Sequence, residues 1–132
     1  MSKREARERA LVALYQMDVI GVDPAEALMN RYEIDEIKPI PLSKELVAGV
    51  VEHLKDIDQV ITKHAKEWNI LRFSNIDRNI LRLAIYEILH RETIPYKVSI
   101  NEAVEMAKMY SNEDAYKFIN GILAQVVKEQ NA

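Results

Sequence analysis

Apolar residues recur at helical spacing through almost the whole chain. The first helix is predicted over residues 3–19, where an apolar side chain returns every three or four positions, and Gly21 ends it. An aspartate followed by a proline predicts a second, short helix over about residues 24–32. Two closely spaced prolines then make residues 33–42 a connecting loop.

The second half of the chain continues the helical pattern. A long helix is predicted over residues 43–68, and the pattern leaves open whether it bends near residues 55–58. Ser74 and Ser99 are each followed three positions later by an acidic residue, a pattern typical of helix starts. A last helix is predicted over residues 113–128.

The fold class follows from these elements. Tyr96–Ile100 is the only candidate for a strand, and no repeat, low-complexity tract or linker divides the chain. Helices of this length are marginal alone, so their apolar stripes must pack on one another. We therefore predict one all-α domain of six or seven helices over residues 1–132.

Composition narrows the chemistry that the protein can perform. There is no cysteine, which excludes disulfides and thiolate chemistry, and the three histidines have no metal-ligand spacing. The three glycines stand too far apart for a phosphate loop. Four of the five serines stand where a helix would start, and capping explains them without a nucleophile: Ser43, Ser74, Ser99 and Ser111. We predict no enzyme, no metal site and no cofactor.

The chain also lacks the signals of a membrane or secreted protein. No window holds the roughly 18 consecutive apolar residues of a membrane span. The N-terminus carries too many mixed charges for a secretory signal. These observations predict a cytoplasmic protein that does not enter a membrane.

Positive charge gathers at the N-terminus although the net charge is −3. Helical spacing places Lys3 or Arg4, and then Arg7, on adjacent turns, from which they would reach successive phosphates of a nucleic acid. A solvated helix face is the competing interpretation, and composition alone favours it. A Glu5–Arg9 pair four residues apart fits that second interpretation.

A few other positions invite a functional or a structural interpretation. Tyr15 stands at the edge of an apolar stripe, where an aromatic ring serves equally as core or as a docking residue. Asp77 is explained by helix capping, whereas the like charges of Arg78 and Arg82, four residues apart, require partners from elsewhere. Gly121 stands inside a predicted helix, where glycine is about 1 kcal/mol less favourable than alanine. Its presence there predicts close approach of the backbone of another helix.

Four segments taken together resemble the NusB family: REARERALVALYQMD, IDRNILRLAIYEI, IPYKVSINEAVEMAKMY and EDAYKFINGILAQV. The resemblance runs along nearly the whole chain, and the last three segments are the most specific. Relatives have a denser arginine run at the start, which Glu5 and Ala6 interrupt here. They also often have glycine in place of Ser111 and serine in place of Ala115.

The resemblance implies a helical domain built from two small bundles, with no catalysis and no cofactor. Family members pair with NusE, a small-subunit ribosomal protein, and the pair binds the boxA element of ribosomal RNA leader transcripts. The complex joins other Nus factors on RNA polymerase and suppresses premature termination. Some members dimerise, so a homodimer of the free protein is compatible with the resemblance.

The resemblance also implies site residues. RNA contacts fall on Lys3, Arg4, Arg7, Lys117 and Phe118, and partner contacts fall on Tyr15, Asp77 and Asp114. For Phe118, core packing is a competing interpretation, because its neighbours Ile119 and Ile122 are expected to be buried. Two other functions stay open: a helical domain related to the N-terminal part of ribosomal RNA cytosine methyltransferases, and a structural protein that self-associates.

Overall fold

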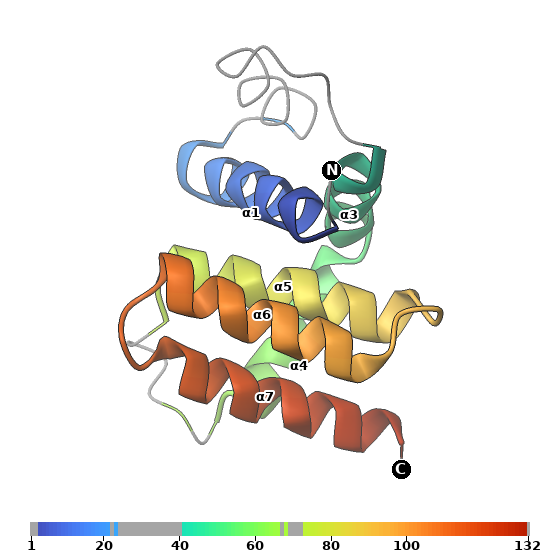
Figure 1. Ribbon diagram of the computed structural model, residues 1–132, viewed down its shortest axis with the longest axis vertical. Coiled ribbons are helices and arrows are strands. Elements are labelled where there is room, and N and C mark those ends of the chain that lie inside the picture. Colours follow the sequence, from blue (N-terminus) through green and yellow to red (C-terminus); the bar gives the residue numbers. More distant parts are fainter. Residues whose placement is uncertain (1–2, 22, 24–40, 67, 69–72, 132) are drawn as a thin grey trace.

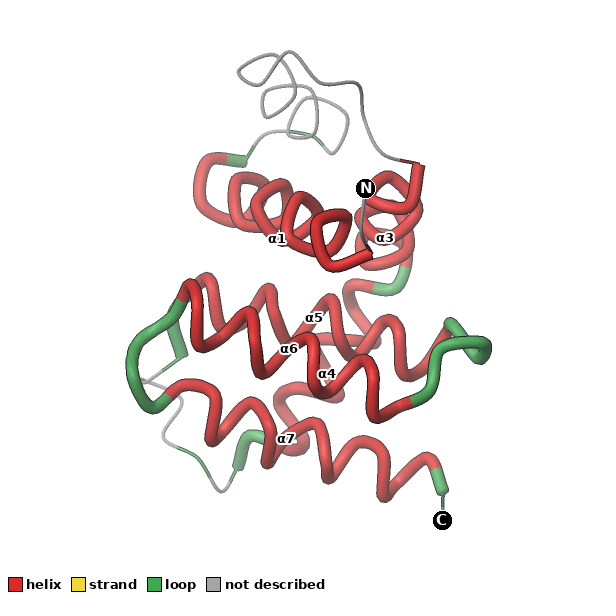
Figure 2. The backbone as a smooth tube through the Cα atoms, in the orientation of Figure 1, coloured by secondary structure: helices red, strands yellow, loops and turns green. Residues whose placement is uncertain are grey.

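The computed structural model describes residues 3–21, 23, 41–66, 68 and 73–131, and these contain six helices and no strand (Figures 1 and 2). The all-α prediction is confirmed. The short helix predicted over residues 24–32 lies outside the described residues. None of the described helices has the length and apolar character needed to span a bilayer. The helices are α1 (Lys3–Ile20), α3 (Pro41–Glu52), α4 (Leu54–His64), α5 (Asn75–His90), α6 (Tyr96–Tyr110) and α7 (Ala115–Gln130).

The helices form two groups that meet at α5. Figure 1 shows α1 and α3 together at one end of the molecule, with α4, α6 and α7 on the other side of α5. Helix α5 packs against each of the other five described helices. Consequently most of its side chains are buried, including charged ones that face neighbouring helices.

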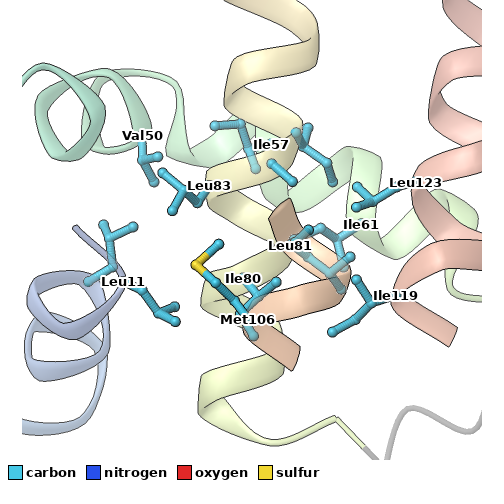
Figure 3. Close-up of a cluster of buried hydrophobic side chains, with 14 of the residues drawn as sticks. Leu11, Val50, Ile57, Ile61, Ile80, Leu81, Leu83, Met106, Ile119 and Leu123 are labelled. Atoms are coloured by element: carbon cyan, nitrogen blue, oxygen red, sulfur yellow. The ribbon is translucent and has the colours of Figure 1, made fainter. Parts of the chain in front are cut away.

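The hydrophobic core draws on all six described helices (Figure 3). Leu11, Val50, Ile57, Met106 and Ile119 come from five different helices, and none exceeds 2% exposure. Several α5 residues complete the cluster. Burying a side chain of this size contributes roughly 1.5–3 kcal/mol, so the short helices are stable because they share this core.

The long helix predicted over residues 43–68 is two helices. The break falls at His53, whose φ of −107° and ψ of 16° leave the helical region, and therefore lies just before the stretch considered for a bend. The reason is tertiary: α3 packs on α1, whereas α4 turns to pack on α5 and α7. The apolar stripe of one straight helix could not face α1 along its first half and both α5 and α7 along its second half.

The capping box at the start of α5 is confirmed. The Ser74 hydroxyl accepts a hydrogen bond from the Asp77 backbone N–H at 3.2 Å, and the Asp77 carboxylate accepts one from the Ser74 backbone N–H at 3.1 Å. Two backbone donors are thereby satisfied at the helix start. The box fixes where α5 begins and where its first turn points.

The predictions that Ser43, Ser99 and Ser111 cap the starts of helices were wrong. Helices α3 and α6 begin earlier, close to prolines whose fixed φ suits a helix start, so Ser43 and Ser99 lie inside them. Their buried hydroxyls donate instead to other helices, at 2.8 Å to the Ala6 carbonyl and at 3.0 Å to Glu87. Ser111 follows the end of α6 and donates to the carboxylate of Asp77.

Candidate RNA and partner interfaces

The start of α1 presents positive charge to solvent. Lys3 is exposed, and the Arg4 side chain is 46% exposed. The Arg4 guanidinium donates two hydrogen bonds to Glu102 of α6, from Nε at 2.8 Å and from Nη2 at 3.3 Å. These bonds, followed by the charge of Glu102, raise the pKa of Arg4. Glu102 therefore holds one edge of the guanidinium against α6 at the protein surface.

Arg7 does not join this exposed cluster. Its side chain is 4% exposed, and Nε and Nη2 each donate to Glu87 of α5 at 2.8 Å. Burial lowers the pKa of Arg7, but the hydrogen bonds and the charge of Glu87 outweigh it, so the net direction is upward. This geometry opposes a direct phosphate contact and gives Arg7 the role of joining α1 to α5.

Phe118 is also buried, at 3% exposure. Its ring stacks on Phe73 with centroids 4.7 Å apart, and the Trp68 ring tilts against it at 6.2 Å. Core packing therefore accounts for its position. Stacking of an RNA base on this ring would require the aromatic cluster to open.

Lys117 and Asp114 lie in solvent beside the buried Phe118. Their side chains are 63% and 56% exposed, and Lys117 Nζ lies 3.4 Å from Asp114 Oδ1. An exposed pair of this kind is weak and readily exchanged for another charged partner. Both groups are available to a ligand at the start of α7.

The fold does not bring all the proposed RNA contacts together. Arg4, at the start of α1, pairs with Glu102 in the middle of α6, whereas α7 begins just beyond the C-terminal end of α6 (Figure 1). Along α1 itself, Arg4 and Tyr15 are about 16 Å apart at 1.5 Å per residue. Lys3 and Arg4 thus form one positive site, and Lys117 belongs to a second.

Tyr15 and Asp77 do meet at one place, though in different roles. Tyr15, 38% exposed, lines a surface hollow of about 590 Å³ with Ser74, Tyr110 and the residues beside Ser74. Asp77 is fully buried beside this hollow and accepts hydrogen bonds from the Ser74 backbone N–H and the Ser111 hydroxyl. Asp77 therefore orders the wall of the hollow, whereas Tyr15 is open to a partner.

Arg78 and Arg82 have the partners that their like charges required. Arg82 donates to Asp58 of α4 at 2.8 and 2.9 Å, and Arg78 Nη1 lies 3.4 Å from Asp18 of α1. Glu87, an acidic residue further along α5, pairs with Arg7 of α1 instead. The sequence signalled the need for partners but not their identity, because they come from distant helices.

Gly121 has a close neighbour of an unexpected kind. A Cβ at this position would lie 2.8 Å from Cζ2 of the Trp68 ring. The prediction of a close helix backbone was therefore wrong, since an aromatic side chain occupies the space. This ring belongs to the cluster around Phe118.

The histidine rings stack on other rings or contact a carboxylate. His53 and His90 stack with centroids 3.8 Å apart, and His64 Nε2 lies 2.8 Å from Glu129 Oε2. In the part of the chain that the structure describes, no three acidic or histidine side chains gather in a way that could hold a metal ion.

A family model and individual relatives both match this chain and agree on one family. The model of the NusB family matches residues 4–128. The chain is 51% identical to the transcription antitermination protein NusB of Pelotomaculum thermopropionicum over 130 residues, covering 97% of this chain and 90% of the relative. It is 45% identical to the protein of the same name from Bacillus subtilis over 126 residues, covering 96% and 95%.

Solved structures agree with these relatives. The fold is similar to that of a chain from the crystal structure of the antitermination factors NusB and NusE in complex with double-stranded RNA, with a TM-score of 0.84, 32% identity and 96% coverage of both chains. It is similar to T. maritima NusB with a TM-score of 0.84, 34% identity, and coverage of 98% and 92%.

Proposed function

The chain belongs to the NusB family, and from that premise we propose that it is a transcription antitermination factor that binds RNA together with the ribosomal protein NusE. The observation that carries the proposal is its likeness, along nearly its whole length, to a NusB chain solved with NusE and RNA. The RNA is the boxA element of ribosomal RNA leader transcripts. The assembled complex joins other Nus factors on RNA polymerase.

The exposed basic residues support RNA binding at two sites on the surface. Lys3 and Arg4 contribute the first, and Lys117 contributes the second. Contacts of this kind neutralise phosphates without reading the base sequence. Arg7 and Phe118 act through the positions that they give to α1 and α7, because neither reaches the surface.

The hollow beside Tyr15 and Tyr110 supports partner binding. Its rim combines two partly exposed tyrosines with the polar start of α5. Aromatic residues of this kind are enriched at protein interfaces. Asp77 orders the start of α5 at this rim, and Asp114 pairs with Lys117 of the second RNA site.

The protein therefore acts in the cytoplasm as an adaptor and uses no cofactor. Its activity is measured by transcription in vitro from a template with a boxA element upstream of a terminator. Addition of the protein with NusE, polymerase and the other Nus factors should increase read-through. The same read-through without this protein, or with a scrambled boxA element, would refute the proposal.

A further inference from the structure

A lysine lies over an aromatic ring on the surface between α6 and α7. The Lys108 Nζ atom is 5.1 Å from the centroid of the Tyr116 ring. The Lys108 side chain is 49% exposed, and its distance of 3.8 Å to Glu105 Oε1 makes that ion pair loose. Tyr116 is partly buried and packs against the core, so its ring is held in place while Lys108 covers it from outside.

We propose that the Tyr116 ring is a stacking platform for an unpaired RNA base, with Lys108 and Lys117 on the neighbouring phosphates. This inference rests on the proposed function, and it assigns the aromatic RNA contact to Tyr116 in place of Phe118. Phe118 lies in the core, whereas Tyr116 reaches the surface two residues earlier on α7. Unstacked bases of single-stranded RNA are commonly bound on tyrosine rings.

The exchange of lysine for a base is favourable at this site. A cation that is itself half exposed to solvent, like that of Lys108, is held weakly over an aromatic ring, because water and salt compete for the charge. Base stacking on an aromatic ring is stronger and tolerates any base. The displaced Lys108 ammonium remains within reach of the backbone of the same nucleotide, where a phosphate replaces Glu105 as its partner.

The surroundings of the ring fit a nucleotide. Lys117 follows directly in sequence and is 63% exposed. Asn120, one helical turn further along α7, is also exposed and offers an amide that both donates and accepts hydrogen bonds. Lys108 stands two residues before Tyr110, which lines the hollow proposed for the partner, so the ring and the hollow lie toward the same end of α6.

The test compares three variants in the complex with NusE: Tyr116→Leu, Tyr116→Phe and Tyr96→Leu. Tyr96 is a matched control, because its ring also packs partly buried against the core, at the opposite end of α6. Affinity for a fluorescent single-stranded boxA RNA is measured by anisotropy. Tyr116→Leu should weaken binding roughly 5- to 150-fold, whereas Tyr116→Phe and the control should stay within about twofold of wild type.

A second readout uses the unaltered protein. RNA carrying 5-iodouridine is irradiated in the complex, and the cross-linked residue is identified by mass spectrometry. A cross-link at Tyr116 is expected, and this result does not depend on whether the leucine variant folds.

A third measurement tests the role of Lys108. Lys108→Gln should lower the slope of log affinity against log salt concentration by about one unit, the amount that corresponds to one lost phosphate contact.

The outcomes separate this inference from the function on which it rests. Tight RNA binding by wild type, with Tyr116→Leu unchanged or with cross-links confined to other residues, would overturn the inference and leave the function standing. If the wild-type complex does not retain boxA RNA at all, both fall.

Discussion

Arg7 and Glu87 form a doubly hydrogen-bonded ion pair inside the protein, with both donor–acceptor distances at 2.8 Å. The two residues come from α1 and α5, and the Ser99 hydroxyl of α6 donates to the same carboxylate at 3.0 Å. Three helices thus meet at one buried charge pair. Its position explains why Arg7 is unavailable to RNA although Lys3 and Arg4 are exposed.

Breaking this pair should destabilise the fold. Arg7→Ala leaves the Glu87 carboxylate buried beside the Ser99 hydroxyl without a positive partner from α1, and we expect the free energy of unfolding to fall by about 3–5 kcal/mol. Urea unfolding measures the change. The double variant Arg7→Met, Glu87→Leu should recover much of the loss, because it removes both charges. A stability loss below about 1 kcal/mol for Arg7→Ala would show that the pair is not structurally important.

Arg4 should behave in the opposite way. Its ion pair with Glu102 is exposed, so Arg4→Ala should change the free energy of unfolding by less than about 1 kcal/mol. The same change should weaken RNA binding for all sequences and lower the salt slope by about one unit. Binding titrations at several salt concentrations measure the slope. The control is Lys55→Ala, an exposed lysine on α4; an Arg4 slope equal to that of wild type would remove Arg4 from the interface.

Tyr15 and Asp77 should separate binding from stability. Tyr15→Ala should weaken binding to NusE, measured by calorimetry. It should leave the free energy of unfolding almost unchanged, because the ring is already 38% exposed. Asp77→Ala should weaken binding and also lower the free energy of unfolding by about 1–3 kcal/mol, because the Ser74 backbone N–H and the Ser111 hydroxyl, both partly buried in these bonds, lose their acceptor. Normal NusE binding by both variants would contradict the placement of the partner surface.

His90 should give stability a dependence on pH. Burial, and then the charge of His53, lower the pKa of His90, while Asp56 and Glu52 partly offset them. The unfolded chain therefore binds this proton more readily, so stability should fall as pH drops below about 6.5 toward the lower folded-state pKa. The free energy of unfolding is measured for wild type and for His90→Asn between about pH 5 and 7.5. An unchanged pH dependence in the variant would rule out this contribution.

Local signals in the sequence were sufficient for much of the fold. Ser74 with Asp77, followed by a long apolar face, predicted the start of α5 correctly, because a capping box is satisfied within one turn. The break at His53 was not predictable in this way. It depends on which helices α3 and α4 meet, and those neighbours are far away in sequence.

The candidate site was harder to predict for the same reason. Spacing placed Lys3, Arg4 and Arg7 on adjacent turns, but the partner of Arg7 stands 80 residues away. One signal was available: Arg7 precedes Leu11 by four positions and so lies on the buried side of α1. Phe118 carried a similar signal in its apolar neighbours, while the contact between Lys108 and Tyr116 required the packing of α6 on α7.

Mobility shift of a short boxA RNA tests the central claim most directly. The RNA is mixed with this protein alone, with NusE alone and with both, beside a scrambled RNA of equal length. We expect a strong shift with both proteins, a weaker one with either alone, and none for the scrambled RNA. Absence of a boxA-specific shift with both correctly folded proteins present would contradict the adaptor function and favour a structural protein.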